Sequence, residues 1–239
     1  YRLNVLGEGG ESFRDDVESE RYDVAPVVSW QVNDSTKIVF EGDFMRNNHP
    51  LDRGLTRYAT QAGSASRDTY IWEKGSDNLL HNDNNMAQVR FEHLLNDNWT
   101  LAGGFQFLDG SLKGNAVEAN GARADGRTLQ RNFNYRKLEW TDKDTQLNLT
   151  GHFSTGGFEH TLLTGVEFED YDYKSIIQRS SAAYTSDIFN PVYGKPRPAL
   201  TSTPTHDKEN LKTYAAFVQD QVALTERLKV LAGARFERF

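Results

Sequence analysis

Histidines and acidic residues are the side chains of this sequence that could hold a metal ion or transfer a proton. The six histidines are His49, His81, His93, His152, His160 and His206. Their scattered positions do not match the spacings of known metal sites, and paired acids such as Asp15 and Asp16 are expected by chance among 34 acidic residues. Patterns typical of serine hydrolases, zinc proteases, phosphate-binding loops and dinucleotide sites are missing. The sequence therefore predicts no catalytic residues, no bound metal and no cofactor, and we expect the protein not to be an enzyme.

The composition bounds the class of protein. The 239 residues include 37% hydrophobic and 26% charged residues, and the mean hydropathy is −0.68. The sequence has no run of about 18 apolar residues that could cross a bilayer as a helix. The net charge of −7 argues against nucleic acid as a partner. The absence of cysteine excludes a disulfide framework. It has three explanations: chance, a reducing compartment, or an envelope protein that avoids thiols.

Short turns alternate with long polar stretches along the chain. Turn signals occur at 33–35, 96–98, 154–157 and 225–227, roughly 60–70 residues apart. Polar stretches at 46–85, 109–132 and 170–210 lie between them, and we expect long loops there. Connections in compact domains are usually about 4–6 residues long. Short turns on one rim and long loops on the other are typical of outer-membrane barrels.

The segments beside the turns alternate between apolar and polar residues, as strands with two different faces do. In the segment 36–44, Ile38 and Phe40 fall on one face, and Lys37 and Glu41 fall on the other. The same period recurs beside each turn, although the faces of 133–141 and 212–222 cannot be assigned. With an opening strand near 1–7, the sequence predicts about nine strands in an all-β, antiparallel up-and-down meander.

Alternation alone fits both a soluble sandwich and a membrane barrel, because only the environment of the two faces differs. Two observations favour the barrel. The strand-like segments continue beyond the roughly 9–11 residues that a membrane crossing requires. Aromatic residues also gather beside the turns, where an interfacial girdle would lie. These aromatic residues are Trp30, Trp99, Phe153 and Phe158.

Several short motifs, in order and spacing, resemble the TonB-dependent siderophore receptors of Gram-negative outer membranes. The resemblance extends over nearly the whole chain. The motifs are SFRD at 12–15, VAPVVSW at 24–30, DRGL at 52–55, FEH at 91–93, NDNWTL at 96–101, HTLLTGVE at 160–167, FNPVYG at 189–194, FVQDQ at 217–221 and LAGARF at 231–236.

The resemblance implies a fold and a function. It implies a transmembrane β-barrel of about 22 strands, of which residues 1–239 would form part. It further implies a receptor that binds a ferric siderophore at its extracellular loops and imports it by TonB-coupled active transport. The partners would be the ferric siderophore, the lipid and lipopolysaccharide of the outer membrane, and the TonB complex. We expect a monomer whose iron arrives only within the chelate, and the general resemblance favours a hydroxamate chelate such as ferrichrome.

Loop residues are the candidates for ligand binding, because aromatic rings with polar tips suit a small organic chelate. For each of them, packing beneath its own loop is the alternative. The candidates are His49, Arg53, Tyr58, Tyr70, Trp72, Tyr184, Phe189 and Tyr193.

Both ends of the sequence lie within strand patterns, and about nine strands would leave two open edges. Unpaired edges are unfavourable in lipid. We therefore expect the chain to be part of a longer receptor whose plug domain, TonB-contacting segment and remaining strands lie outside it. Two other functions remain open: a passive porin-like or adhesin barrel, and a soluble all-β carbohydrate-binding module.

Overall fold

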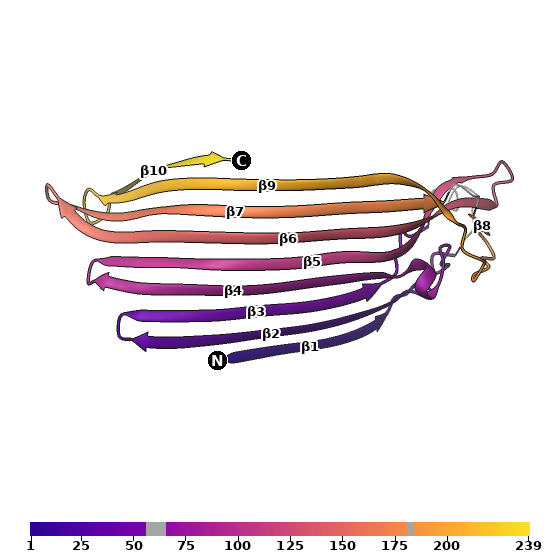
Figure 1. Cartoon of the computed structure of the whole chain (residues 1–239), viewed down its shortest axis with the longest axis horizontal. Helices are drawn as coiled ribbons and strands as arrows, with labels where there is room; N and C mark the ends of the chain where they lie inside the picture. The colour runs from indigo at the N-terminus through magenta and orange to yellow at the C-terminus, as the bar shows by residue number, and fades with distance from the viewer. Residues whose placement is uncertain (56–65, 181–183) are drawn as a thin grey trace.

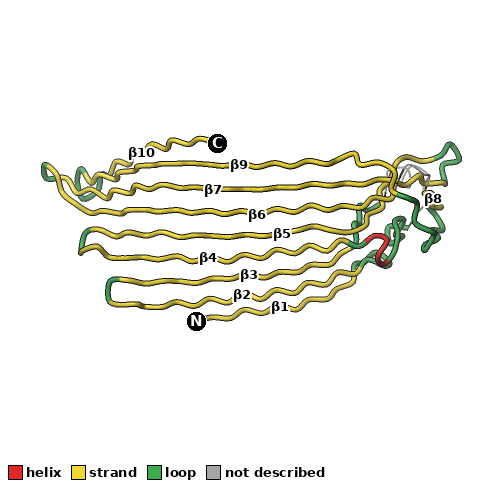
Figure 2. Tube along the Cα trace, in the orientation of Figure 1, coloured by secondary structure: helices red, strands yellow, loops and turns green. Residues whose placement is uncertain are grey.

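The computed structural model describes residues 1–55, 66–180 and 184–239, which form one antiparallel sheet (Figures 1 and 2). Nine strands follow one another across this sheet. They are β1 (Arg2–Glu11), β2 (Glu18–Asn33), β3 (Thr36–His49), β4 (Leu80–Asn96), β5 (Trp99–Ala122), β6 (Thr128–Thr155), β7 (Phe158–Ser180), β9 (Leu200–Ala223) and β10 (Lys229–Arg238). The two short elements are the 3₁₀ helix η1 (Gly75–Asn78) and the strand β8 (Tyr184–Asp187).

Strand order follows chain order from β1 to β10, with β8 paired only to β6. The up-and-down meander and its nine successive strands confirm the predicted fold class. Within the described part of the chain, β1 and β10 each pair on one side only, so the sheet is open. None of the described helical residues forms a segment long and apolar enough to cross a membrane.

The four tight turns lie where the sequence predicted them, all at one end of the sheet, here called the turn end (Figure 1). The Asn33 and Asn96 side chains each accept a hydrogen bond from the backbone N–H two residues later, at 3.0 and 2.9 Å. This local bond is the reason asparagine favours turns. Gly156 and Gly157 both have positive φ, as a two-residue hairpin turn requires.

Two of the three predicted long loops are much shorter than predicted. The stretch 109–132 is mostly strand, because β5 extends to Ala122 and β6 begins at Thr128. The stretch 170–210 likewise consists largely of β7 and β9. Strands that project beyond an apolar layer carry polar residues on both faces, so their alternation disappears although their backbone pairing continues. The stretch 46–85 contains the long connection that joins His49 to Leu80, and the stretch 170–210 contains a shorter one, 181–199, which includes β8.

Register places one continuous row of apolar residues across eight strands on what we call the apolar face. The row runs through Trp30, Ile38, Phe91, Gly103, Leu147, Val166, Ala216 and Phe236. Trp30 is 55% exposed and Val166 is 54% exposed. A sandwich would cover such a face with a second sheet, but the described residues form only one sheet. The apolar face therefore needs an apolar medium outside this chain.

The apolar rows end toward the loops at a row of charged residues. Lys143 lies opposite Asp170, which lies opposite Lys212. The Lys212 Nζ and Asp170 Oδ2 atoms are 4.0 Å apart. From this row to the end of β6 at Thr155 there are about a dozen residues, which matches the length of one membrane crossing by a tilted strand.

The opposite face is polar and charged, and we call it the polar face. Arg90 donates to Glu41 across β3 and β4 at 2.6 Å, and Arg235 donates to Glu167 from β10 at 3.0 Å. Glutamine and asparagine continue these rows at Gln106 and Asn148. The sheet thus separates an apolar medium from a polar one.

Candidate functional site

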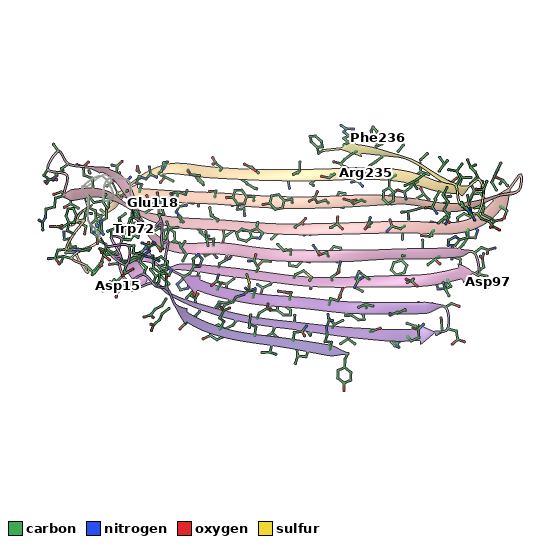
Figure 3. All side chains as sticks on the ribbon, turned by 180° about the vertical axis from the view of Figure 1, so that it is seen from behind. Asp15, Trp72, Asp97, Glu118, Arg235 and Phe236 are labelled. Carbon is green, nitrogen blue, oxygen red and sulfur yellow. The ribbon has the colours of Figure 1, made fainter. Side chains whose placement is uncertain are left out.

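Three of the four connections at the other end of the strands, here called the loop end, gather into one assembly. They comprise the described parts of 50–79 and 181–199, and the five-residue turn 123–127. Figure 3 shows Trp72 and Glu118 close to this assembly and Asp97 at the opposite end of the sheet. The β1–β2 tip joins the assembly, because the Arg14 Nε atom donates to Asp52 at 2.8 Å.

Eight buried apolar residues form the centre of this assembly, which we call the loop core. The loop core consists of Tyr70, Ile71, Trp72, Val117, Leu129, Phe133, Tyr184 and Ile188. Trp72 is 1% exposed and Tyr184 is 4% exposed. The Phe133 and Tyr184 rings meet edge to face with centroids 6.1 Å apart, a favourable aromatic geometry. The loop core therefore joins the connection 50–79 to the ends of β5, β6 and β8.

A buried ion pair lies beside the loop core. Arg131 on β6 contacts Glu73 with 3.4 Å between Nη2 and Oε2, and neither side chain is more than 1% exposed. Glu73 also accepts hydrogen bonds from the Tyr184 hydroxyl at 2.6 Å and from the Gly194 N–H at 2.8 Å. Arg131 donates in turn to the carbonyl oxygens of Ile71 and Trp72. One carboxylate therefore connects both long loops to the sheet.

Burial keeps the loop tyrosines in their neutral form. Loss of solvation raises the pKa of Tyr70 and of Tyr184 well above the ordinary value for tyrosine. The same cause, with help from Asp16 and Asp15, raises the pKa of Tyr193 to about 12. The neutral Tyr193 hydroxyl donates to the Tyr70 carbonyl at 2.6 Å. These three tyrosines act as hydrogen-bonding packing residues.

The connection 50–79 contacts β5 at a glycine. Asn78 accepts a hydrogen bond from the Val117 backbone N–H at 3.0 Å and so continues the sheet edge past the end of β4. Gly114 has a φ of 149° where the chain passes Leu79. A Cβ atom at Gly114 would overlap the Leu79 carbonyl oxygen. Only glycine allows this close approach of two backbones.

Gly114→Ala should therefore detach the connection from β5. We expect backbone strain of about 1–3 kcal/mol in addition to the overlap, and faster protease cleavage between 66 and 79 in the purified full-length protein. Gly126→Ala is the control, because its φ of 64° is also positive but no atom lies near its added Cβ. Equal cleavage of the 66–79 segment in the two variants would contradict this account.

The structure brings together four of the eight candidate binding residues. Tyr70, Trp72 and Tyr184 belong to the loop core, and Tyr193 packs against it. The rings of Tyr70, Trp72 and Tyr184 are buried within the assembly and Tyr193 is partly buried against them, which is the packing alternative stated above. Whether any of the four contacts a ligand stays a prediction.

Three of the remaining candidates, His49, Arg53 and Phe189, are not part of the loop core. His49 ends β3, where burial lowers its pKa, and its Nδ1 atom has no hydrogen-bond partner. Phe189 is 36% exposed, with the Arg127 guanidinium 5.9 Å from its ring centroid. Arg53 donates to Glu118 at 2.5 Å. Tyr58 lies outside the described residues.

Sequence reasoning missed the charged cluster that contains Arg53. Glu118 on β5 also forms ion pairs with Arg136 on β6 and with Arg179 on β7, the latter at 3.8 Å. The four residues come from three strands and one loop, so no local motif marks them. The cluster could have been predicted only by extending the pairing of β5, β6 and β7 beyond the apolar rows. In contrast, no group of three or more acidic or histidine side chains in the described ranges could hold a metal ion.

Comparisons with known proteins agree with the sheet geometry. The family model described as TonB dependent receptor-like, beta-barrel matches residues 29–239. The metal-pseudopaline receptor CntO of Pseudomonas aeruginosa strain UCBPP-PA14 is 36% identical over 242 residues, which cover 100% of this chain and 34% of that protein. The ferrichrome outer membrane transporter/phage receptor of Escherichia coli K12 is 26% identical over 270 residues, covering 99% of this chain and 35% of that protein.

Among solved structures, the closed form of the ferric-catecholate import receptor Fiu of E. coli K12 superposes with a TM-score of 0.85. The sequences are 21% identical, and the alignment covers 98% of this chain and 36% of Fiu. At this identity the likeness establishes the fold alone. The chain spans about a third of the length of the curated relatives it matches.

Proposed function

The chain belongs to the TonB-dependent receptor β-barrel family, and from this premise we propose that it forms part of the wall and the outer loops of a receptor that imports a metal chelate. The single observation that carries the proposal is the two-faced sheet, apolar across eight strands on one side and charged on the other. Such a sheet suits a barrel with lipid outside and a polar interior. We place it in the outer membrane of a Gram-negative bacterium.

The cargo in this proposal is a metal ion already wrapped by an organic chelator. The relatives are named for different chelators: pseudopaline, ferrichrome and catecholates. A hydroxamate remains the prediction from the sequence, and metal–pseudopaline is the competing cargo suggested by the 36% identical receptor.

The remaining partners belong to the same proposal. The apolar face would contact membrane lipid, and the charged rows beyond it would meet lipopolysaccharide. Energy would come from the TonB complex through a plug segment outside this chain, and we expect the receptor to act as a monomer.

Uptake by the full-length receptor tests the proposal. We expect a strain that lacks its other chelate receptors to accumulate radiolabelled metal from ferrichrome, from metal–pseudopaline or from a ferric catecholate once the receptor is expressed. Accumulation should be saturable and should stop when TonB is removed. Accumulation that persists without TonB and rises linearly with concentration would instead indicate a passive pore. No accumulation from any of the three chelates would overturn the import function.

A further inference from the structure

We propose that Arg53, Arg136 and Arg179 form an anion site that binds a carboxylate group of the chelate. This inference rests on the proposed import function and names the chemistry of its cargo. The three guanidinium groups surround Glu118 at the loop end of the sheet, where Figure 3 labels Glu118.

Glu118 holds the arginines close to one another. Its Oε1 atom accepts hydrogen bonds from both Arg53 and Arg136, so these two guanidinium groups meet at one oxygen. Its Oε2 atom accepts from Asn134 at 3.2 Å, and Asn134 accepts in turn from the Arg179 Nε atom at 2.9 Å. The arrangement is a connected network in which three hydrogen bonds reach the Glu118 carboxylate and a fourth joins Arg179 to Asn134.

The network carries more positive than negative charge. Among the described residues, Glu118 is the one acid that pairs with any of these three arginines, so three positive charges share one negative charge. Like charges held this close repel one another, and the repulsion strengthens where water is excluded. The Arg136 Nε atom is buried and has no hydrogen-bond partner. A second carboxylate would relieve the repulsion, because arginine binds carboxylates through paired N–H groups.

The site is open enough to admit a ligand. The side chain of Arg53 is 51% exposed and that of Arg179 is 39% exposed, whereas Glu118 is only 14% exposed. The carboxylate therefore lies beneath two accessible guanidinium groups. An incoming anion could contact both arginines without displacing Glu118.

The face of the sheet on which the site lies indicates whether its ligand is a chelate or the phosphate group of a membrane lipid. Glu118 and Arg136 have the same parity along β5 and β6 as Gln106 and Asn148 of the polar face. Arg179 has the same parity along β7 as Glu167. In a closed barrel this face lines the interior, so the site belongs to the passage of the cargo. Lipid headgroups would contact the opposite surface of the sheet, at the charged rows beyond the apolar residues.

Binding to the full-length receptor tests the site with three probes: ferric citrate, metal–pseudopaline and ferrichrome. We expect the tightest of them to carry carboxylates. The double variant Arg53→Gln/Arg179→Gln should weaken that binding about a hundredfold, since each charged hydrogen bond contributes about tenfold or more. Adding salt should weaken binding to the wild type more than to the double variant, because the variant has lost the exposed charges.

Arg46→Gln is the matched control. Arg46 forms an exposed one-to-one pair with Asp83 on the opposite face, so its loss should leave chelate affinity unchanged. Arg53→Lys/Arg179→Lys keeps the charge and should restore part of the affinity. Tightest binding to ferrichrome, a neutral hydroxamate complex, would overturn the anion site and leave the import function intact, as would unchanged affinity in the double Gln variant. If none of the three chelates binds, the import function fails and the anion site fails with it.

Discussion

Glu73→Ala should open the loop assembly while the sheet stays folded. The change leaves Arg131 buried without its acidic partner and removes the acceptor for Tyr184 and Gly194. Breaking a buried ion pair on one side costs about 3–5 kcal/mol. An opening equilibrium shifted by about 3 kcal/mol corresponds to roughly a hundredfold more open molecules. Limited proteolysis of the full-length receptor in detergent should show cleavage in 66–79 and 184–199 accelerated to about that extent.

Two further variants test whether faster cleavage comes from loss of the buried ion pair or from loss of any acidic side chain. Asp83→Ala removes the partner of Arg46 in a pair exposed to solvent, and we expect almost no change because exposed pairs contribute little. Glu73→Gln keeps an acceptor for Tyr184 but loses the charge, so its cleavage rate should fall between those of wild type and Glu73→Ala. Cleavage of Glu73→Ala at the rate of Asp83→Ala would refute the role of Glu73.

Phe40→Arg should destabilise the barrel itself. Phe40 lies on the apolar face opposite Val28 and Val89, with 47% of its surface exposed. Arginine on the lipid face near the middle of the bilayer costs about 2–4 kcal/mol. Reversible unfolding of the full-length receptor in lipid vesicles, followed by tryptophan fluorescence in denaturant, should show a loss of that size in the free energy of unfolding.

The control for Phe40→Arg places the same charge on the other face. Gln106→Arg lies on the polar face opposite Asp144, where a cation meets an acid and no lipid. We expect it to leave the free energy of unfolding nearly unchanged. Equal losses in the two variants would mean that the two faces meet the same environment, which would remove the barrel assignment.

The sequence predicted the fold where local chemistry decides it. Three of the four turns follow from asparagine and glycine. The fourth follows from Thr225, whose hydroxyl accepts hydrogen bonds from the backbone N–H groups of Arg227 and Leu228. These preferences act within two or three residues. The apolar face near the turns follows from strict alternation, as at Ile38 and Phe40. Alternation fails along the outer halves of β5, β6, β7 and β9, because apolar and polar residues mix on both faces there, as at the adjacent Ile176 and Ile177 of β7. Backbone pairing alone extends these strands, and pairing between distant segments leaves no local signal.

The candidate site was harder to predict, for a different reason. A loop has no periodic face, so Trp72 and Phe189 look alike in the sequence although one is buried and the other partly exposed. The pair between Glu73 and Arg131 joins residues 58 positions apart. The arginines around Glu118 come from three separate segments. Charged residues beside aromatic residues in the sequence hint at a binding site, but the sequence does not show which residues each charge contacts.

Because β6 is long, a solute from outside the cell contacts this protein before it contacts the membrane. Its 28 residues extend about 90 Å at 3.3 Å per residue, whereas a bilayer crossing takes only about 9–11 of them. With a tilt of about 40°, the wall rises roughly 40 Å above the hydrocarbon. A molecule approaching from outside therefore touches the rim well before it reaches the lipid surface. The outer rim of the strands therefore contacts the surrounding medium at a distance from the membrane surface.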